Sequence, residues 1–181
     1  MRNPLQPQID RRLFLIARRR PPGPFARSSA KFASPWATVA EGLAAALALR
    51  AAGRPAIPAA VAAPAALLIG DAIKRVASRP RPGLARFARK GRQSFPSTHV
   101  AGPAALLACA WCLAPRTKAW LALLGLASGW TALIARERVC AGEHWATDVA
   151  AGGALGILVG LALGRSGSSG IDLTPAEGAT P

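Results

Sequence analysis

Charge is segregated along this sequence into short basic clusters, and five apolar stretches between them contain no lysine or arginine. A soluble basic protein would intersperse its charges with apolar positions. Long apolar stretches bounded by basic clusters are instead typical of integral membrane proteins. We therefore expect an all-α, polytopic membrane helical bundle of about five transmembrane helices, at residues 35–49, 57–73, 100–113, 119–135 and 145–163.

The net charge of +15 raises nucleic-acid binding as a rival interpretation. The long apolar stretches disfavour it, because they leave no soluble core that could carry a basic face. Three cysteines are an odd number and predict no disulfide framework. Cys109 and Cys112 form a CxxC pattern inside an apolar stretch, where we expect small residues that face lipid or another helix rather than redox or metal chemistry.

Three regions follow from the distribution of charge and proline. Residues 1–34 form a basic, proline-interrupted arm without a signal-peptide pattern, which we expect in the cytoplasm or as a short helix on anionic lipid. Residues 35–164 form the membrane domain, and residues 165–181, rich in Ser, Gly and Pro, form a tail expected to be disordered. The Ala/Gly/Arg-rich composition suggests a bacterium, so the expected location is the bacterial plasma (inner) membrane.

Five spans would place the loops 74–98 and 136–144 on the same membrane face as the N-terminus. The first of these loops holds eight Lys or Arg residues and no acid, which fits both cytoplasmic retention and an anion-binding surface. The positive-inside rule predicts that this face is cytoplasmic.

Two features predict how the spans pack. Glu41 makes the first span the weakest, and we expect its carboxylate to face the bundle interior or lie near the interface. Glycines recur at every fourth position of the last span, which predicts close approach of another helix within the bundle. These glycines are Gly152, Gly156, Gly160 and Gly164.

His99 and His144 are the only histidines in the chain. Asp148 follows His144 at i+4, a spacing that on a helix places both side chains on one face. A carboxylate there can accept the Nδ1 proton and leave Nε2 free to attack as a nucleophile. The alternative is a capping histidine and a solvated aspartate at the start of a helix.

Basic and capping residues predict an anion site on the same face. Ser97 is a good N-cap, and a helix starting there would direct its free N–H groups towards the region of His99. Lys74, Arg81 and Arg138 would add three positive charges, and together these groups can hold a phosphoryl group.

Three segments in this order resemble the signature of the type 2 phosphatidic acid phosphatases. They are Lys-x6-Arg-Pro at residues 74–82, Pro-Ser-x-His at residues 96–99, and Arg-x5-His-x3-Asp at residues 138–148. Glu137 stands where the family usually has Ser, which could alter local charge and substrate preference. The resemblance covers roughly residues 35–164 and implies the fold of that family.

The resemblance also implies site roles. His144 would be the nucleophile that forms a phosphohistidine, Asp148 would orient it, and His99 would protonate the leaving oxygen and then activate water. The phosphate-binding residues would be Lys74, Arg81, Ser97, Thr98 and Arg138.

No metal and no cofactor are expected, because the sequence offers no further carboxylate or histidine cluster. The expected substrate is a lipid phosphate or diphosphate: a polyprenyl phosphate, a prenyl-linked phosphosugar or a phosphatidate-like lipid. Two alternatives stay open. One is a vanadate-dependent haloperoxidase, which resembles the same motifs but is soluble and larger. The other is a non-catalytic membrane protein whose basic face binds anionic lipid or a partner.

Overall fold

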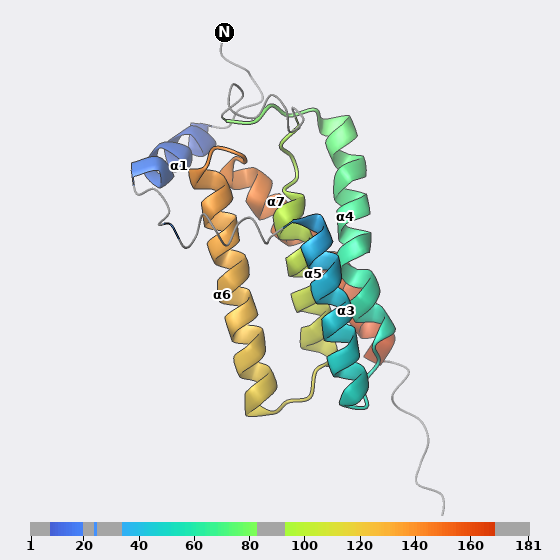
Figure 1. The fold of residues 1–181 in the computed structure, drawn as a ribbon. Coiled ribbons are helices and arrows are strands. Elements are labelled where there is room, and N and C mark those ends of the chain that lie inside the picture. The colour runs from blue at the N-terminus through green and yellow to red at the C-terminus, as the bar shows by residue number, and fades with distance from the viewer. Residues whose placement is uncertain (1–7, 20–23, 25–33, 83–92, 169–181) are drawn as a thin grey trace, which may run out of the picture.

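The structure is a computed structural model that describes residues 8–19, 24, 34–82 and 93–168. Within this part of the chain every regular element is a helix, and the only β-type pairing is an isolated bridge between Pro80 and Gln93. The expected all-α bundle is confirmed (Figure 1). The helices are α1 (Gln8–Arg19), α3 (Pro35–Ala51), α4 (Ile57–Ala77), α5 (Thr98–Leu113), α6 (Lys118–Cys140) and α7 (Ala146–Ser168).

Three of these helices, α4, α6 and α7, have 21 to 23 residues and are long and apolar enough to cross a membrane. The helix α5 is apolar but has only 16 residues, and α3 has 17. On α3 the side chain of Glu41 is exposed, so of the two expected positions the bundle interior is excluded, and a position near the interface stays a prediction. The neighbouring Gly42 faces inward instead, where a Cβ atom would lie 3.3 Å from the carbonyl oxygen of Ala59.

The tightest packing in the bundle joins α5 to α7. Cβ atoms added at Gly152, Gly156 and Gly160 would lie 2.2 to 2.3 Å from backbone carbonyl oxygens of α5 and its N-cap residue. Only hydrogen fits at these positions, so the two helix backbones lie in direct contact. The predicted glycine face within the bundle is confirmed, and α5 and α7 form one close-packed pair.

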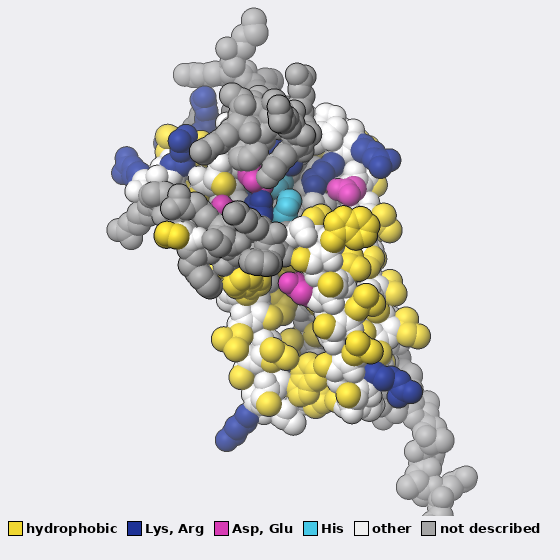
Figure 2. Space-filling model, viewed as in Figure 1, with side chains coloured by type: hydrophobic (Ala, Val, Ile, Leu, Met, Phe, Trp, Pro, Cys, Tyr) yellow, Lys and Arg dark blue, Asp and Glu magenta, His cyan; other side chains and the backbone are white. Residues whose placement is uncertain are grey.

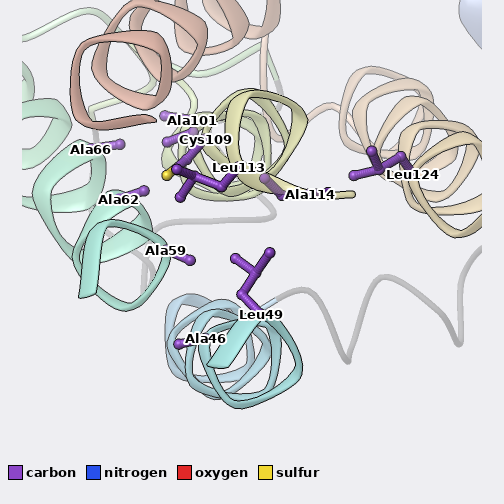
Figure 3. Packing of buried hydrophobic residues seen from close by; sticks show 12 residues of the cluster. Ala46, Leu49, Ala59, Ala62, Ala66, Ala101, Cys109, Leu113, Ala114 and Leu124 are labelled. Carbon is purple, nitrogen blue, oxygen red and sulfur yellow. The ribbon is translucent and has the colours of Figure 1, made fainter. Parts of the chain in front are cut away.

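An alanine-rich core holds α3, α4 and α5 together away from the charged end of the molecule. Figure 3 shows Leu49 of α3 pointing towards α5, which contributes Cys109 and Leu113 to the same cluster. Cys109 is fully buried, and its thiol and that of Cys112 are free, as expected for packing residues. At the same end the Nε atom of Arg54 donates to the carbonyl oxygen of Leu113 (2.7 Å) and so caps α5 with a positive charge.

The helix α1 lies across the ends of α6 and α7 (Figure 1). The ring of Phe14 meets Trp145 edge to face at 5.6 Å, and Cys140 Sγ donates to the carbonyl oxygen of Ala17 (3.4 Å). The N-terminal helix therefore lies at the same end of the bundle as residues 79–82 and 141–148, as the span count predicted. Charged side chains gather at this end, whereas hydrophobic side chains cover most of the remaining visible surface (Figure 2).

Candidate active site

Two loop segments lie side by side above the bundle and join the first two motifs. The backbone N–H of Ser94 donates to the carbonyl oxygen of Arg79 (2.7 Å), and the Ser94 hydroxyl donates to the same oxygen (3.1 Å). Further along, the N–H of Ser97 donates to the carbonyl oxygen of Asp148 in α7 (2.9 Å). Backbone hydrogen bonds thus fix all three motifs relative to one another.

His144 lies in the turn before α7, which begins at Ala146, so the expectation that His144 and Asp148 share a helical face is wrong. The Nδ1 atom of His144 lies 2.8 Å from the carbonyl oxygen of Ser94 and 3.7 Å from Asp148 Oδ2. A carbonyl oxygen can only accept, so Nδ1 carries the proton of the neutral ring. The Nε2 lone pair is therefore available, which is the state that a nucleophilic histidine needs.

Asp148 holds the turn that carries His144 through a hydrogen bond to its backbone. Its Oδ2 atom accepts the backbone N–H of Trp145 (2.8 Å), an acidic side chain at the third helical position reaching back to the residue before the helix. Its Oδ1 atom accepts from Arg79 Nη1 (2.7 Å). Asp148 is fully buried, so its charge is felt strongly at the neighbouring imidazole.

The surroundings keep His144 neutral at pH 7. Its side chain is fully buried, and burial lowers the pKa of His144 below the usual range, while the carboxylate of Asp148 opposes this shift. Arg81 Nη1 lies 3.5 Å from His144 Nε2. A guanidinium can only donate hydrogen bonds, so it does not compete with Nε2 as a base. It stands where it could bind an oxygen of a phosphoryl group that Nε2 attacks.

His99 lies in the first turn of α5, and its ring centroid is 6.1 Å from that of His144. The Nδ1 atom of His99 and the hydroxyl of Ser97 are both buried and have no hydrogen-bond partner among the described residues. Ser97 is the N-cap residue of α5, as predicted, but its side chain makes no capping bond. The Val100 N–H donates to the Ser97 carbonyl oxygen (3.2 Å), so the Ser97 hydroxyl and the N–H groups of Thr98 and His99 remain for an anion.

The three predicted cations approach the same region from three elements. Lys74 at the end of α4 donates to Thr98 Oγ1 (2.6 Å), and Arg81 donates to the carbonyl oxygen of Glu143 (2.8 Å). Arg138 at the end of α6 pairs with Glu143 Oε2 (2.6 Å), and its carbonyl oxygen accepts the N–H of His144 (3.2 Å). All eight predicted site residues therefore lie at one end of the bundle.

Several residues of this cluster were missed from the sequence. Ser94 contributes a backbone carbonyl, which leaves no trace in side-chain identity. Arg79 and Glu143 lie inside the first and third motifs, at positions where the motif specifies no residue type. Asp10 is the only acid in residues 1–34, and that contrast with the basic arm is the signal that could have singled it out.

An apolar groove of about 420 Å³ leads away from the cluster between α5 and α6, with α7 behind it. On α5 its lining runs from Val100, next to His99, to Trp111. From Val100 to Trp111 the helix rises about 16 Å, roughly half the thickness of a bilayer's hydrocarbon core. Apart from Ser128 and Thr131, the residues that line the groove are apolar or glycine, so the groove suits a hydrocarbon chain.

The family model described as PAP2 superfamily matches residues 55–167, more than half of the 181 residues. The chain belongs to the PAP2 superfamily. The matched region runs from before α4 into α7 and contains every predicted site residue, while α1 and α3 lie outside it. No match was found among curated proteins or among solved structures.

Membership of the PAP2 superfamily supports a phosphatase, a hydrolase of phosphoesters, built from membrane helices. In this PAP2 member the cations at the site are lysine and arginine side chains. Within the described ranges, no three His, Cys, Asp or Glu side chains lie close enough together to hold a metal ion.

Glu137 replaces the Ser that usually precedes the motif arginine. It is buried, and its Oε2 atom lies 3.7 Å from Arg138 Nε. With Glu143 it places two carboxylates around one guanidinium.

Proposed function

We propose that the protein is a metal-independent phosphatase of a lipid phosphate or diphosphate, which crosses the bacterial plasma membrane several times and works through a phosphohistidine on His144. The observation that carries this proposal is the Nδ1 contact of His144 with the Ser94 carbonyl (2.8 Å), which leaves Nε2 unprotonated beside Arg81. A buried, neutral and oriented imidazole is suited to nucleophilic attack on phosphorus.

In the proposed first step the cations and the N-terminus of α5 hold the phosphoryl oxygens. The Nε2 lone pair of His144 attacks phosphorus, the bond from phosphorus to the lipid oxygen breaks, and that oxygen takes a proton from His99. The ring of His144 then bears a positive charge, which the buried carboxylate of Asp148 stabilises at 3.7 Å.

In the second step water attacks the phosphohistidine and gives a proton to His99. The bond between Nε2 and phosphorus breaks, and inorganic phosphate leaves. His144 returns to its neutral form with the Nδ1 proton still donated to Ser94. The proton that His99 gave up in the first step is thereby restored.

The groove supports a lipid as the substrate. Its lining on α5 starts at Val100, the residue that follows His99 in the chain, and is mostly apolar on α5 and α6. A hydrocarbon chain in the groove would therefore have its phosphate end towards the histidines. The helix α6 buries few side chains against the bundle, which leaves room for a lipid on one side.

The proposal is tested by phosphate release from the detergent-purified protein with EDTA present. The panel comprises a polyprenyl diphosphate, a polyprenyl monophosphate, phosphatidate and phosphatidylglycerophosphate. We expect release from at least one lipid at a rate that EDTA leaves unchanged. Release that stops with EDTA and returns with a divalent cation would contradict the metal-independent mechanism, and binding of these lipids without turnover would favour the non-catalytic alternative.

Filling the groove should separate lipid binding from chemistry. Ala132 lines the groove on α6, and Ala132→Phe is expected to raise KM for a long-chain lipid phosphate about tenfold, as for ~1.4 kcal/mol of lost apolar contact. A short-chain, water-soluble phosphate ester should be hydrolysed as by wild type.

The matched control for this variant is Leu126→Phe. Leu126 lies on the same helix, is 74% exposed and does not line the groove. Equal KM values for the long-chain lipid in Ala132→Phe and Leu126→Phe would show that the chain binds elsewhere.

A further inference from the structure

Asp10 is an acid from outside the matched PAP2 region that reaches the active-site end of the bundle. It lies in α1, and its side chain is fully buried. Its carboxylate accepts three hydrogen bonds: from Arg79 Nη2 (2.5 Å), from the Thr147 hydroxyl (2.6 Å) and from the Thr147 backbone N–H (3.0 Å). A buried carboxylate with this many donors is held in one orientation.

Arg79 connects this carboxylate to the catalytic aspartate. Its Nη2 atom donates to Asp10, and its Nη1 atom donates to Asp148 Oδ1 and to the Thr147 hydroxyl (2.7 Å each). The guanidinium carbon also lies 5.8 Å from the ring of Trp145. One planar cation therefore bridges two buried carboxylates, and the position of each carboxylate depends on that of the other through the guanidinium.

We propose that Asp10 is a positioning residue for the phosphatase reaction, which acts through Arg79 and Thr147 on Asp148 and hence on His144. This inference rests on the proposed function. Asp10 shares the positive charge of Arg79, which otherwise falls on Asp148 alone and weakens the field of that carboxylate at the His144 ring. Asp10 also accepts the N–H of Thr147 in the first turn of α7, the turn that Asp148 closes.

Ionisation of Asp10 agrees with this role. Burial raises the pKa of Asp10, but the hydrogen bonds from Thr147 and the charge of Arg79 outweigh burial, and the net shift is downward. Asp10 is therefore a carboxylate at neutral pH. Its influence is present above the ordinary aspartate pKa of about 4 and is lost only as the pH falls below its lowered value.

A purely structural role for Asp10, holding α1 to the bundle, predicts a different kinetic signature. Loss of structure reduces the number of competent sites and leaves the rate at each remaining site unchanged. Loss of positioning leaves the number of sites unchanged and slows the formation of the phosphohistidine at each one. A rapid-mixing experiment that traps the phosphoenzyme measures both quantities, as the burst amplitude and the burst rate constant.

The experiment uses the full chain in detergent with the most active lipid of the panel. We expect Asp10→Asn to keep the burst amplitude and KM of wild type and to lower the burst rate constant about 10- to 100-fold, as for a lost hydrogen bond between charged groups. Asp10→Glu, which keeps the charge, should lie nearer to wild type. The control Arg12→Gln, at an exposed position of the same helix, should be indistinguishable from wild type.

Arg79→Lys provides a second variant that retains a positive charge but cannot bridge both carboxylates. It should also slow the burst at unchanged amplitude. A wild-type burst rate in Asp10→Asn or in Arg79→Lys, or a reduced amplitude at an unchanged rate, overturns the inference. A wild-type protein that forms no phosphoenzyme overturns the proposed function itself, and the inference with it.

Discussion

His144→Asn should lose phosphate release by about 10⁴-fold or more, because no other side chain can take the place of a covalent nucleophile. His99 is the only other histidine, and its ring centroid is 6.1 Å away. Asparagine is preferable to alanine because its amide can still donate to the Ser94 carbonyl, which would otherwise be left buried and unpaired at a cost of about 1–3 kcal/mol. The loss should therefore appear without loss of folding.

The measurement is capture of label from a lipid substrate carrying radioactive phosphate, followed by denaturation in alkali. Wild type should retain label during turnover, and His144→Asn none. His99→Ala should accumulate label when the substrate has a good leaving group such as a diphosphate, because the water that hydrolyses the phosphohistidine then lacks its base. Label retained by His144→Asn would place the phosphoryl group on another residue and remove His144 from its role.

Gly152→Ala is the second change with a large expected effect. A Cβ atom at Gly152 would lie 2.3 Å from the carbonyl oxygen of Ser97, and its three nearest atoms all belong to the Ser97 backbone. Relief requires α5 and α7 to move apart, which breaks the contact between Ser97 N–H and the Asp148 carbonyl. We expect destabilisation of roughly 1–3 kcal/mol or more and loss of most phosphatase activity.

Gly153→Ala is the matched control. It has the same gain in helix propensity, lies one residue further along α7, and its Cβ would meet only Val100 Cγ1 at 3.9 Å. Thermal unfolding in detergent should show Gly153→Ala at or above wild-type stability and Gly152→Ala well below it. Equal melting temperatures for the two variants would contradict the close contact between α5 and α7.

The helices from α3 to α7 could be predicted because each contains an apolar stretch between basic clusters, and that pattern depends only on local sequence. The predicted ends were short at α4, α6 and α7, where polar residues continue the helix beyond the apolar segment: Lys74 remains within α4, and Arg138 within α6. The meeting of the eight predicted site residues at one end of the bundle could be predicted, because they lie within three short motifs that a five-span topology places on one face.

The geometry of His144 could not be predicted in the same way. A spacing of four residues fits one face of a helix, but it equally fits a residue before the helix and an acid in its first turn. Nor could the sequence predict that Trp145, at the start of the last predicted span, is buried. It is 5% exposed and donates from Nε1 to the Pro80 carbonyl oxygen (2.9 Å).

Contacts between distant segments were beyond the reach of the sequence. Asp10 and Thr147 are separated by 137 positions, and nothing local to either predicts that they meet. The Ser94 carbonyl that orients His144 is a backbone atom, which any residue at position 94 would provide.

The helices α5 and α7 are in such close contact that few substitutions fit between them. The helix α6 packs more loosely and can vary. Both histidines belong to the close-packed pair, since His99 is carried by α5 and His144 by the turn that leads into α7. The helix α6 forms one wall of the groove and buries mainly the residues near the site. If the groove binds a lipid as proposed, substitutions along the part of α6 away from the site would change which lipid is accepted while the chemistry stays intact. Specificity in such a small phosphatase would then diverge through a single helix.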